Sequence, residues 1–143
     1  MIILDTSGLL AAIDGSQRMH RPCADAIGGS RGPLLLSPFV LAELDYLLGT
    51  RVSAGAQDAL LEEVERGAYR LEPFTAEDVA RAREIAKQYQ SLEIGLADSS
   101  IVVLAERHHV RDVLTLDERH FRTLRYGRGS RFRLLPADLS KSR

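Results

Sequence analysis

A chain of 143 residues is long enough for one compact domain and too short for two ordinary ones. Its content of 45% hydrophobic and 27% charged residues is typical of a globular protein and excludes a disordered one. Cys23 is the only cysteine, which excludes an intramolecular disulfide and a cysteine-rich zinc site.

The net charge of −1 combines two segments of opposite sign. Residues 1–118 hold 11 basic and 19 acidic residues, a charge of −8, and residues 119–143 hold 8 basic residues and one acid, a charge of +7. This separation predicts an acidic pocket and a basic C-terminal segment from about residue 119, which suits a protein that cuts a polyanion at a cation-loaded site. A solvated basic tail would give the same composition.

No secretion signal or membrane span is predicted. Met1 leads directly into an apolar run at 2–4 without a charged leader, and no stretch approaches the roughly 20 apolar residues of a membrane helix. We therefore expect a cytoplasmic protein without membrane contact.

The first half of the chain alternates short apolar runs with helical patterns. Residues 2–4 and 34–36 are apolar without alternation, as in strands that are covered on both faces. Helices are predicted at 6–13 and 18–27. Ser37 and Pro38 are an N-cap and a first helical residue, Gly49 is the predicted end of that helix, and another helix follows at 56–65.

The second half continues the alternation. A strand is predicted at 69–74, a helix from Thr75 to about residue 90, and a helix at 96–108. A strand at 113–114, a short helix at 118–124 and a last strand at 132–135 complete the chain. This order predicts one α/β domain over 1–143, a three-layer α/β/α sandwich with a central parallel sheet of four to five strands. In such sheets the functional crevice lies beyond the carboxyl ends of the strands.

Four carboxylates occupy positions from which they could reach that crevice. Asp5 and Asp117 follow predicted strands, Glu43 lies at the margin of a buried helical stripe, and Asp98 lies in a segment that is apolar nearly all round. Each has a simpler explanation: the three aspartates could cap helices, and Glu43 could be a surface residue.

Convergence of the four acids would require a cation. Two carboxylates about 4 Å apart repel by roughly 4 kcal/mol at an effective dielectric constant near 20. Oxygen ligands favour Mg²⁺ or Mn²⁺ over zinc, and such an ion can activate a water molecule against a phosphodiester. The sequence has no nucleophile-elbow motif, glycine-rich phosphate loop or zinc-protease helix.

The sequence around these acids resembles PIN domains, and especially the VapC-type toxins of bacterial toxin–antitoxin pairs. The resemblance rests on four ordered stretches, which are ILDTSGLLA at 3–11, SPFVLAEL at 37–44, GLADSSI at 95–101 and LTLDERHF at 114–121. It extends from residue 2 to about residue 132. It implies a Mg²⁺- or Mn²⁺-dependent endoribonuclease that inhibits translation, with Asp5, Glu43, Asp98 and Asp117 holding the metal and the attacking water.

The resemblance also implies partners and supporting residues. The hydroxyl groups of Thr6 or Ser7 would support the site, a cognate antitoxin would silence it, and the toxin would form a homodimer. The substrate would be a structured RNA, either a transfer RNA or a ribosomal RNA loop. A catalytically silent PIN-like module that binds protein or RNA is the alternative.

The basic segment offers candidate RNA contacts. Arg122, Arg125 and Arg128 suit phosphate binding, although they could equally be solvated surface residues. The spacing of the histidines, including His120, matches no common metal site. Two other folds with an acid after the first strand fit poorly: a haloacid-dehalogenase-type phosphatase needs an aspartate where Ser7 stands, and a receiver domain needs a lysine near its fifth strand.

Overall fold

The computed structural model describes residues 1–139, so that Lys141 and Arg143 of the predicted basic segment lie outside the described residues. Five parallel strands form the central sheet in the order β3-β2-β1-β4-β7. Their bounds are β1 Ile2–Leu4, β2 Leu34–Leu36, β3 Arg70–Leu71, β4 Asp112–Leu114 and β7 Arg133–Leu135. A separate antiparallel hairpin pairs β5 (Arg125–Tyr126) with β6 (Ser130–Arg131).

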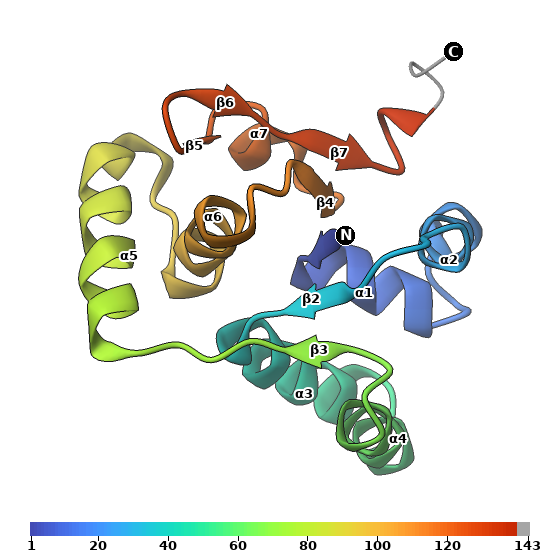
Figure 1. Cartoon of the computed structure of the whole chain (residues 1–143). Coiled ribbons are helices and arrows are strands. Elements are labelled where there is room, and N and C mark those ends of the chain that lie inside the picture. Colours follow the sequence, from blue (N-terminus) through green and yellow to red (C-terminus); the bar gives the residue numbers. More distant parts are fainter. Residues whose placement is uncertain (140–143) are drawn as a thin grey trace.

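Helices flank the sheet and pack on one another in pairs. In Figure 1, α5 and α6 lie side by side at the left of the view, and α1 and α2 lie together at the right. A third pair is formed by α3 and α4. The helices are α1 Thr6–Ile13, α2 His20–Gly28, α3 Pro38–Arg51, α4 Ala54–Glu65, α5 Ala76–Gln88, α6 Leu96–His108 and α7 Glu118–Phe121, with a 3₁₀ turn η1 at Gln90–Leu92. The predicted fold class is confirmed.

The two adjacent strands β1 and β4 determine where the residues directly after them lie. Ile3 of β1 lies opposite Val113 of β4, and Leu4 lies opposite Leu114; all four side chains are fully buried. Because β1 and β4 are parallel and in register, both strands end at the same edge of the sheet. Residues 5 and 115 therefore begin the segments beyond that edge.

The predicted helix starts at residues 37 and 75 are confirmed. The Ser37 hydroxyl accepts a hydrogen bond from the Phe39 amide at 3.2 Å, and Pro38 is the first helical residue. Thr75 and Asp78 form a reciprocal capping box. These side chains satisfy amides that the first turn of a helix leaves free.

Gly49 was expected to end a helix, and this expectation is wrong. α3 continues through Arg51. A Cβ atom at Gly49 would lie 2.4 Å from Nε2 of Gln57 on α4, and that nitrogen donates a hydrogen bond to the Asp45 carbonyl at 2.9 Å. The glycine thus permits close packing of α3 against α4 instead of terminating α3.

Other bounds differ from the prediction at the ends of elements. The strand expected at 69–74 is limited to β3, because Pro73 has no amide hydrogen to extend a ladder whose last bond joins Glu72 N to Leu36 O at 2.9 Å. The helix expected at 118–124 ends at Phe121, and the hairpin of β5 and β6 was not predicted. The remaining helix ends differ by one or two residues.

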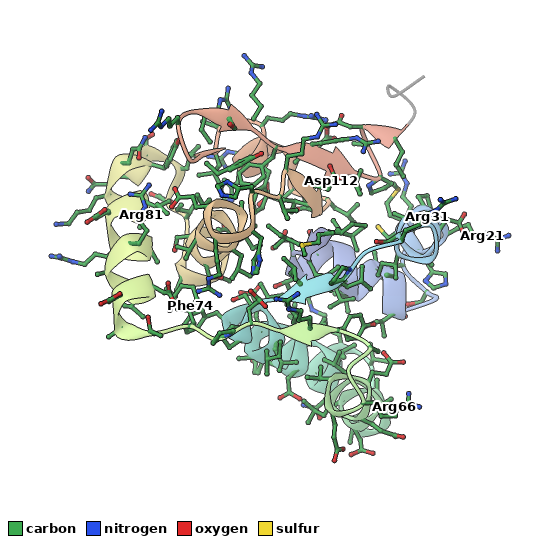
Figure 2. The ribbon with its side chains drawn as sticks, viewed as in Figure 1. Arg21, Arg31, Arg66, Phe74, Arg81 and Asp112 are labelled. Atoms are coloured by element: carbon green, nitrogen blue, oxygen red, sulfur yellow. The ribbon has the colours of Figure 1, made fainter. Side chains whose placement is uncertain are left out.

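The outer helix pair is tied by an ion pair. Arg81 on α5, labelled in Figure 2, donates from Nε and Nη2 to the carboxylate of Glu106 on α6 at 3.1 and 2.8 Å. Among residues 1–139, none of the helices has the length and apolar content needed to cross a bilayer.

Candidate active site

Asp5 lies at the carboxyl end of β1, where its amide donates to the Leu114 carbonyl at 3.0 Å. It occupies the N-cap position of α1, but its side chain makes no capping hydrogen bond. The Thr115 hydroxyl donates to Oδ2 of Asp5 at 2.7 Å, and the Ser7 hydroxyl donates to the same oxygen at 3.1 Å. Asp5 is buried, so the structure holds its carboxylate in place for something other than capping.

The four predicted acids line one cavity of about 450 Å³. Glu43 reaches it from α3, Asp98 from the first turn of α6, and Asp117 from the N-cap of α7. Asp98 is the third residue of its helix, which begins at Leu96 after Gly95, so the cap alternative for Asp98 is wrong. Asp117 does act as a cap, accepting the His120 amide at 3.1 Å, while it also lines the cavity.

The carboxylates affect one another electrostatically. Burial raises the pKa of Asp5 to about 6; the hydrogen bond from Thr115 lowers it in part, and the charge of Asp98 raises it. Burial also raises the pKa of Asp98, where the charge of His120 lowers it and the charges of Asp117 and Glu43 raise it. This is the accumulation of negative charge that a divalent cation relieves.

Of the two residues expected to support the site, only Ser7 contacts an acid through its hydroxyl. Ser7 donates to Asp5 and accepts the Leu116 amide at 3.0 Å. Thr6 lines the cavity, but its buried hydroxyl has no hydrogen-bond partner among the described residues. Thr115 was missed: its hydroxyl donates to Asp5 and accepts the Asp117 amide at 2.9 Å, and so links two of the acids.

His120 was also missed as a neighbour of the acids. Its Nδ1 atom lies 3.2 Å from Oδ2 of Asp98 and 2.8 Å from Oδ2 of Asp117. The three ligand atoms lie within 4.8 Å of one another. The Asp-x-x-His spacing was visible in the sequence, but only the direction of α7 brings the ring to Asp98.

Among residues 1–139, Arg51 is the one cationic side chain that lines the cavity, and it does not belong to the predicted basic segment. Arg51, in the last turn of α3, lines the cavity together with Gln17 and is exposed. It makes no ion pair with another residue in the range 1–139. Because α3 was expected to end at Gly49, Arg51 could not be predicted to line the same cavity as Glu43.

The predicted RNA contacts lie away from this cavity. The guanidinium of Arg122 binds Asp138 at 2.7 and 2.8 Å and Glu118 at 2.8 Å. That of Arg125 donates from Nη1 to three backbone carbonyls. Arg128, in the turn between β5 and β6, is exposed. A role of these three in RNA binding stays a prediction.

Comparison with known proteins identifies the fold. The PIN domain family matches residues 2–125, which is most of the chain and includes all four acids. The chain belongs to the PIN-domain family. Ribonuclease VapC26 of Mycobacterium tuberculosis (strain ATCC 25618 / H37Rv) is 44% identical to this PIN domain over 135 residues, which are 94% of this chain and the whole of that protein. This PIN domain is therefore a homologue of a VapC ribonuclease toxin.

Solved structures agree on the fold. Mycobacterium tuberculosis VapC20, described as a sarcin-ricin loop cleaving toxin, has a TM-score of 0.77 at 20% identity and covers 82% of this chain and 90% of its own. Rickettsia felis VapBC2, bound to a DNA fragment from its promoter, has a TM-score of 0.65 at 17% identity over 94% and 98% of the two chains. Neisseria gonorrhoeae FitAcB has a TM-score of 0.56 at 23% identity over 82% and 88%.

Proposed function

We propose that this PIN domain is a metal-dependent endoribonuclease and the toxin of a type II toxin–antitoxin pair. The observation that carries the proposal is the convergence of Asp5, Glu43, Asp98 and Asp117 on one cavity beyond the carboxyl ends of β1 and β4. The 44% identity to a ribonuclease over nearly the whole chain supports the same activity. A module that only binds protein or RNA would have no need of a buried carboxylate whose pKa is raised by burial and, in addition, by the charge of Asp98.

The donor set fits Mg²⁺, with Mn²⁺ as a substitute. The four acids present carboxylate oxygens, the ligands that these hard ions prefer. Burial is the main cause of the raised pKa values of Asp5 and Asp98, and the charges of neighbouring acids raise both further, which supports a cation at this site. We assign the ion to Asp5, Glu43, Asp98 and Asp117. When bound, such an ion lowers the pKa of a coordinated water and neutralises charge on the phosphate.

The protein's own residues prepare this chemistry. The hydroxyls of Thr115 and Ser7 fix Oδ2 of Asp5, and Thr115 also accepts the Asp117 amide, so the two acids keep a constant separation. Glu43 is exposed at the mouth of the cavity, where it can accept a proton from a water molecule. Arg51 supplies a positive charge at the same cavity for a phosphate of the substrate.

We propose a structured RNA, a transfer RNA or a ribosomal RNA loop, as the substrate, in the cytoplasm. The separation of an acidic cavity from a basic C-terminal segment supports a polyanionic substrate. VapC20 is described as cleaving such a loop. We further propose a cognate antitoxin as the partner and a homodimer as the assembly, with Thr6 and Ser7 supporting the site and Arg122, Arg125 and Arg128 as the RNA contacts of the basic segment.

Cleavage assays with purified protein test the proposal. Wild type is incubated with transfer RNA and ribosomal RNA in Mg²⁺, in Mn²⁺ and in EDTA, beside Asp98→Asn and the control Asp58→Asn. Asp58 is an exposed acid on α4 outside the cavity. We expect cleavage by wild type and by the control in either metal, and none in EDTA or with Asp98→Asn.

Metal binding is measured in parallel by thermal unfolding. A ligand at 100 times its Kd stabilises a native protein by about 2.7 kcal/mol. Mn²⁺ should raise the melting temperature of wild type and Asp58→Asn much more than that of Asp98→Asn. Undiminished cleavage by a folded Asp98→Asn protein would remove Asp98 from the mechanism, and equal melting shifts would place the ion elsewhere.

A further inference from the structure

His120 has an unusual relation to two of the acids. Its ring nitrogen Nδ1 lies 3.2 Å from Asp98 and 2.8 Å from Asp117, yet it is not aligned for a hydrogen bond with either oxygen. The atom is buried and has no hydrogen-bond partner among the described residues. Both neighbouring carboxylates contact this nitrogen, but neither contact has the alignment of a hydrogen bond, so the nitrogen is poorly satisfied by the protein alone.

The distances match those between neighbouring ligands of one ion. In an octahedral site with metal–ligand bonds of about 2.1 Å, adjacent ligand atoms are separated by about 3.0 Å. The two separations at His120 lie on either side of this value. The contact distances and the missing hydrogen bond are therefore both explained by an ion that Asp98, Asp117 and His120 share.

The short helix α7 fixes this arrangement before any ion binds. Oδ1 of Asp117 accepts the backbone amide of His120, which leaves Oδ2 beside the ring of the same residue. The ring is only 19% exposed, so it cannot easily turn away into solvent. Preorganised ligands lose little freedom on binding.

We propose that Nδ1 of His120 is a ligand of the metal held by Asp98 and Asp117, and that this PIN domain prefers a transition-metal ion such as Mn²⁺ over Mg²⁺. The inference rests on the proposed metal-dependent function and changes its ligand set. Mg²⁺ demands oxygen ligands and retains its waters, whereas divalent transition metals accept imidazole nitrogen. A site made only of carboxylates would lack this preference.

Electron spin resonance of bound Mn²⁺ tests the ligand directly. An imidazole nitrogen bound to Mn²⁺ gives a ¹⁴N coupling in the electron spin echo. We expect this coupling in wild type and in His109→Asn, and its loss in His120→Asn. His109 makes a matched control because it is exposed and has φ of 54°, a conformation that asparagine tolerates.

Calorimetric titration with Mn²⁺ and with Mg²⁺ gives the second readout. His120→Asn should weaken Mn²⁺ binding by at least the roughly 10- to 100-fold that the loss of a residue supporting a ligand costs at other metal sites, and Mg²⁺ binding much less. If wild type binds Mn²⁺ through Asp98 without a ¹⁴N coupling, the histidine proposal fails and the metal-dependent nuclease remains. If wild type binds neither ion at Asp98, both proposals fail.

Discussion

The hydroxyl of Thr115 donates a hydrogen bond to Oδ2 of Asp5 at 2.7 Å, although the two residues are 110 positions apart in the chain. The same hydroxyl accepts the Asp117 amide at 2.9 Å. This contact exists because β1 and β4 are parallel neighbours that end in register, so each strand delivers its next residue to the same edge. One buried side chain thereby sets the separation of two acids.

Thr115→Val should disturb both acids. The loss of a donor to the ionised carboxylate raises the pKa of Asp5 further, because that hydrogen bond lowers it. The Asp117 amide also loses its partner, and we expect a loss of about 1–3 kcal/mol in unfolding free energy. Urea unfolding and NMR titration of Asp5 measure the two effects. Thr123→Val, at an exposed position, is the control, and a pKa of Asp5 that does not rise would refute the coupling.

Asp5→Asn should stabilise the metal-free protein, with a definite dependence on pH. Burial raises the pKa of Asp5 from 3.8 to about 6, so ionisation of this residue opposes folding. Below pH 3.8 the carboxyl is neutral in both states and has no such cost; between pH 3.8 and 6 the cost grows, and above pH 6 it is complete at about 3 kcal/mol. Urea unfolding in EDTA should therefore show a gain for Asp5→Asn at pH 7.5 that disappears near pH 3.5. A gain independent of pH would contradict the assigned cause.

Arg51→Gln should weaken RNA binding more than Arg122→Gln. Arg51 lines the cavity and makes no ion pair with an acid within residues 1–139, whereas Arg122 is bound by Asp138 and Glu118. Each phosphate contact contributes about 0.7–0.9 to the slope of log K against log salt concentration. RNA binding by the uncleaving Asp98→Asn protein, measured over a salt series, should lose about this slope with Arg51→Gln. The exposed Arg128 should behave like Arg51 if the β5–β6 hairpin touches RNA, and a slope that only Arg122→Gln changes would reverse the assignment.

Gly8→Ala should separate α1 from β4. A Cβ atom at Gly8 would lie 2.5 Å from the backbone oxygen of Leu114, which cannot move aside without disturbing the sheet. Overpacking of this kind costs about 1–3 kcal/mol or more, and it would also pull Ser7 away from the Leu116 amide. Gly15→Ala is the matched control, since no atom lies within 4 Å of a Cβ there. Equal unfolding free energies for the two variants would show that the contact is soft.

The order of elements and the four acids could be predicted from the sequence because each leaves a local mark. Buried parallel strands are short apolar runs, and the acids follow them or lie beside apolar stripes. Thr115 could not be recognised as the hydrogen-bond donor to Asp5, because this contact depends on which strands are neighbours and in which register they pair. The pattern of residues along a single sequence does not indicate that β1 pairs with β4.

His120, Arg51 and Gly49 illustrate the same limit at helix ends. The position of the His120 ring depends on the direction of α7. Arg51 reaches the cavity only because α3 continues for two residues beyond Gly49, where the helix was expected to end. Gly49 is needed because the side chain of Gln57 on α4 packs against it, and such a tertiary contact leaves no local mark in the sequence. The β5–β6 hairpin is two short polar pairs around a Gly-Arg-Gly turn and has no apolar pattern to detect.

The placement of β4 beside β1 has a consequence for a cell that synthesises this protein. β1 is made first, but its neighbour across the sheet and the acid that follows that neighbour are made only after four-fifths of the chain. A fragment that ends before residue 112 lacks β4, Thr115 and Asp117, so it has neither the strand that pairs with β1 on this side nor the fourth acid. Only a chain synthesised beyond residue 117 carries all four acids together with the strands that position them.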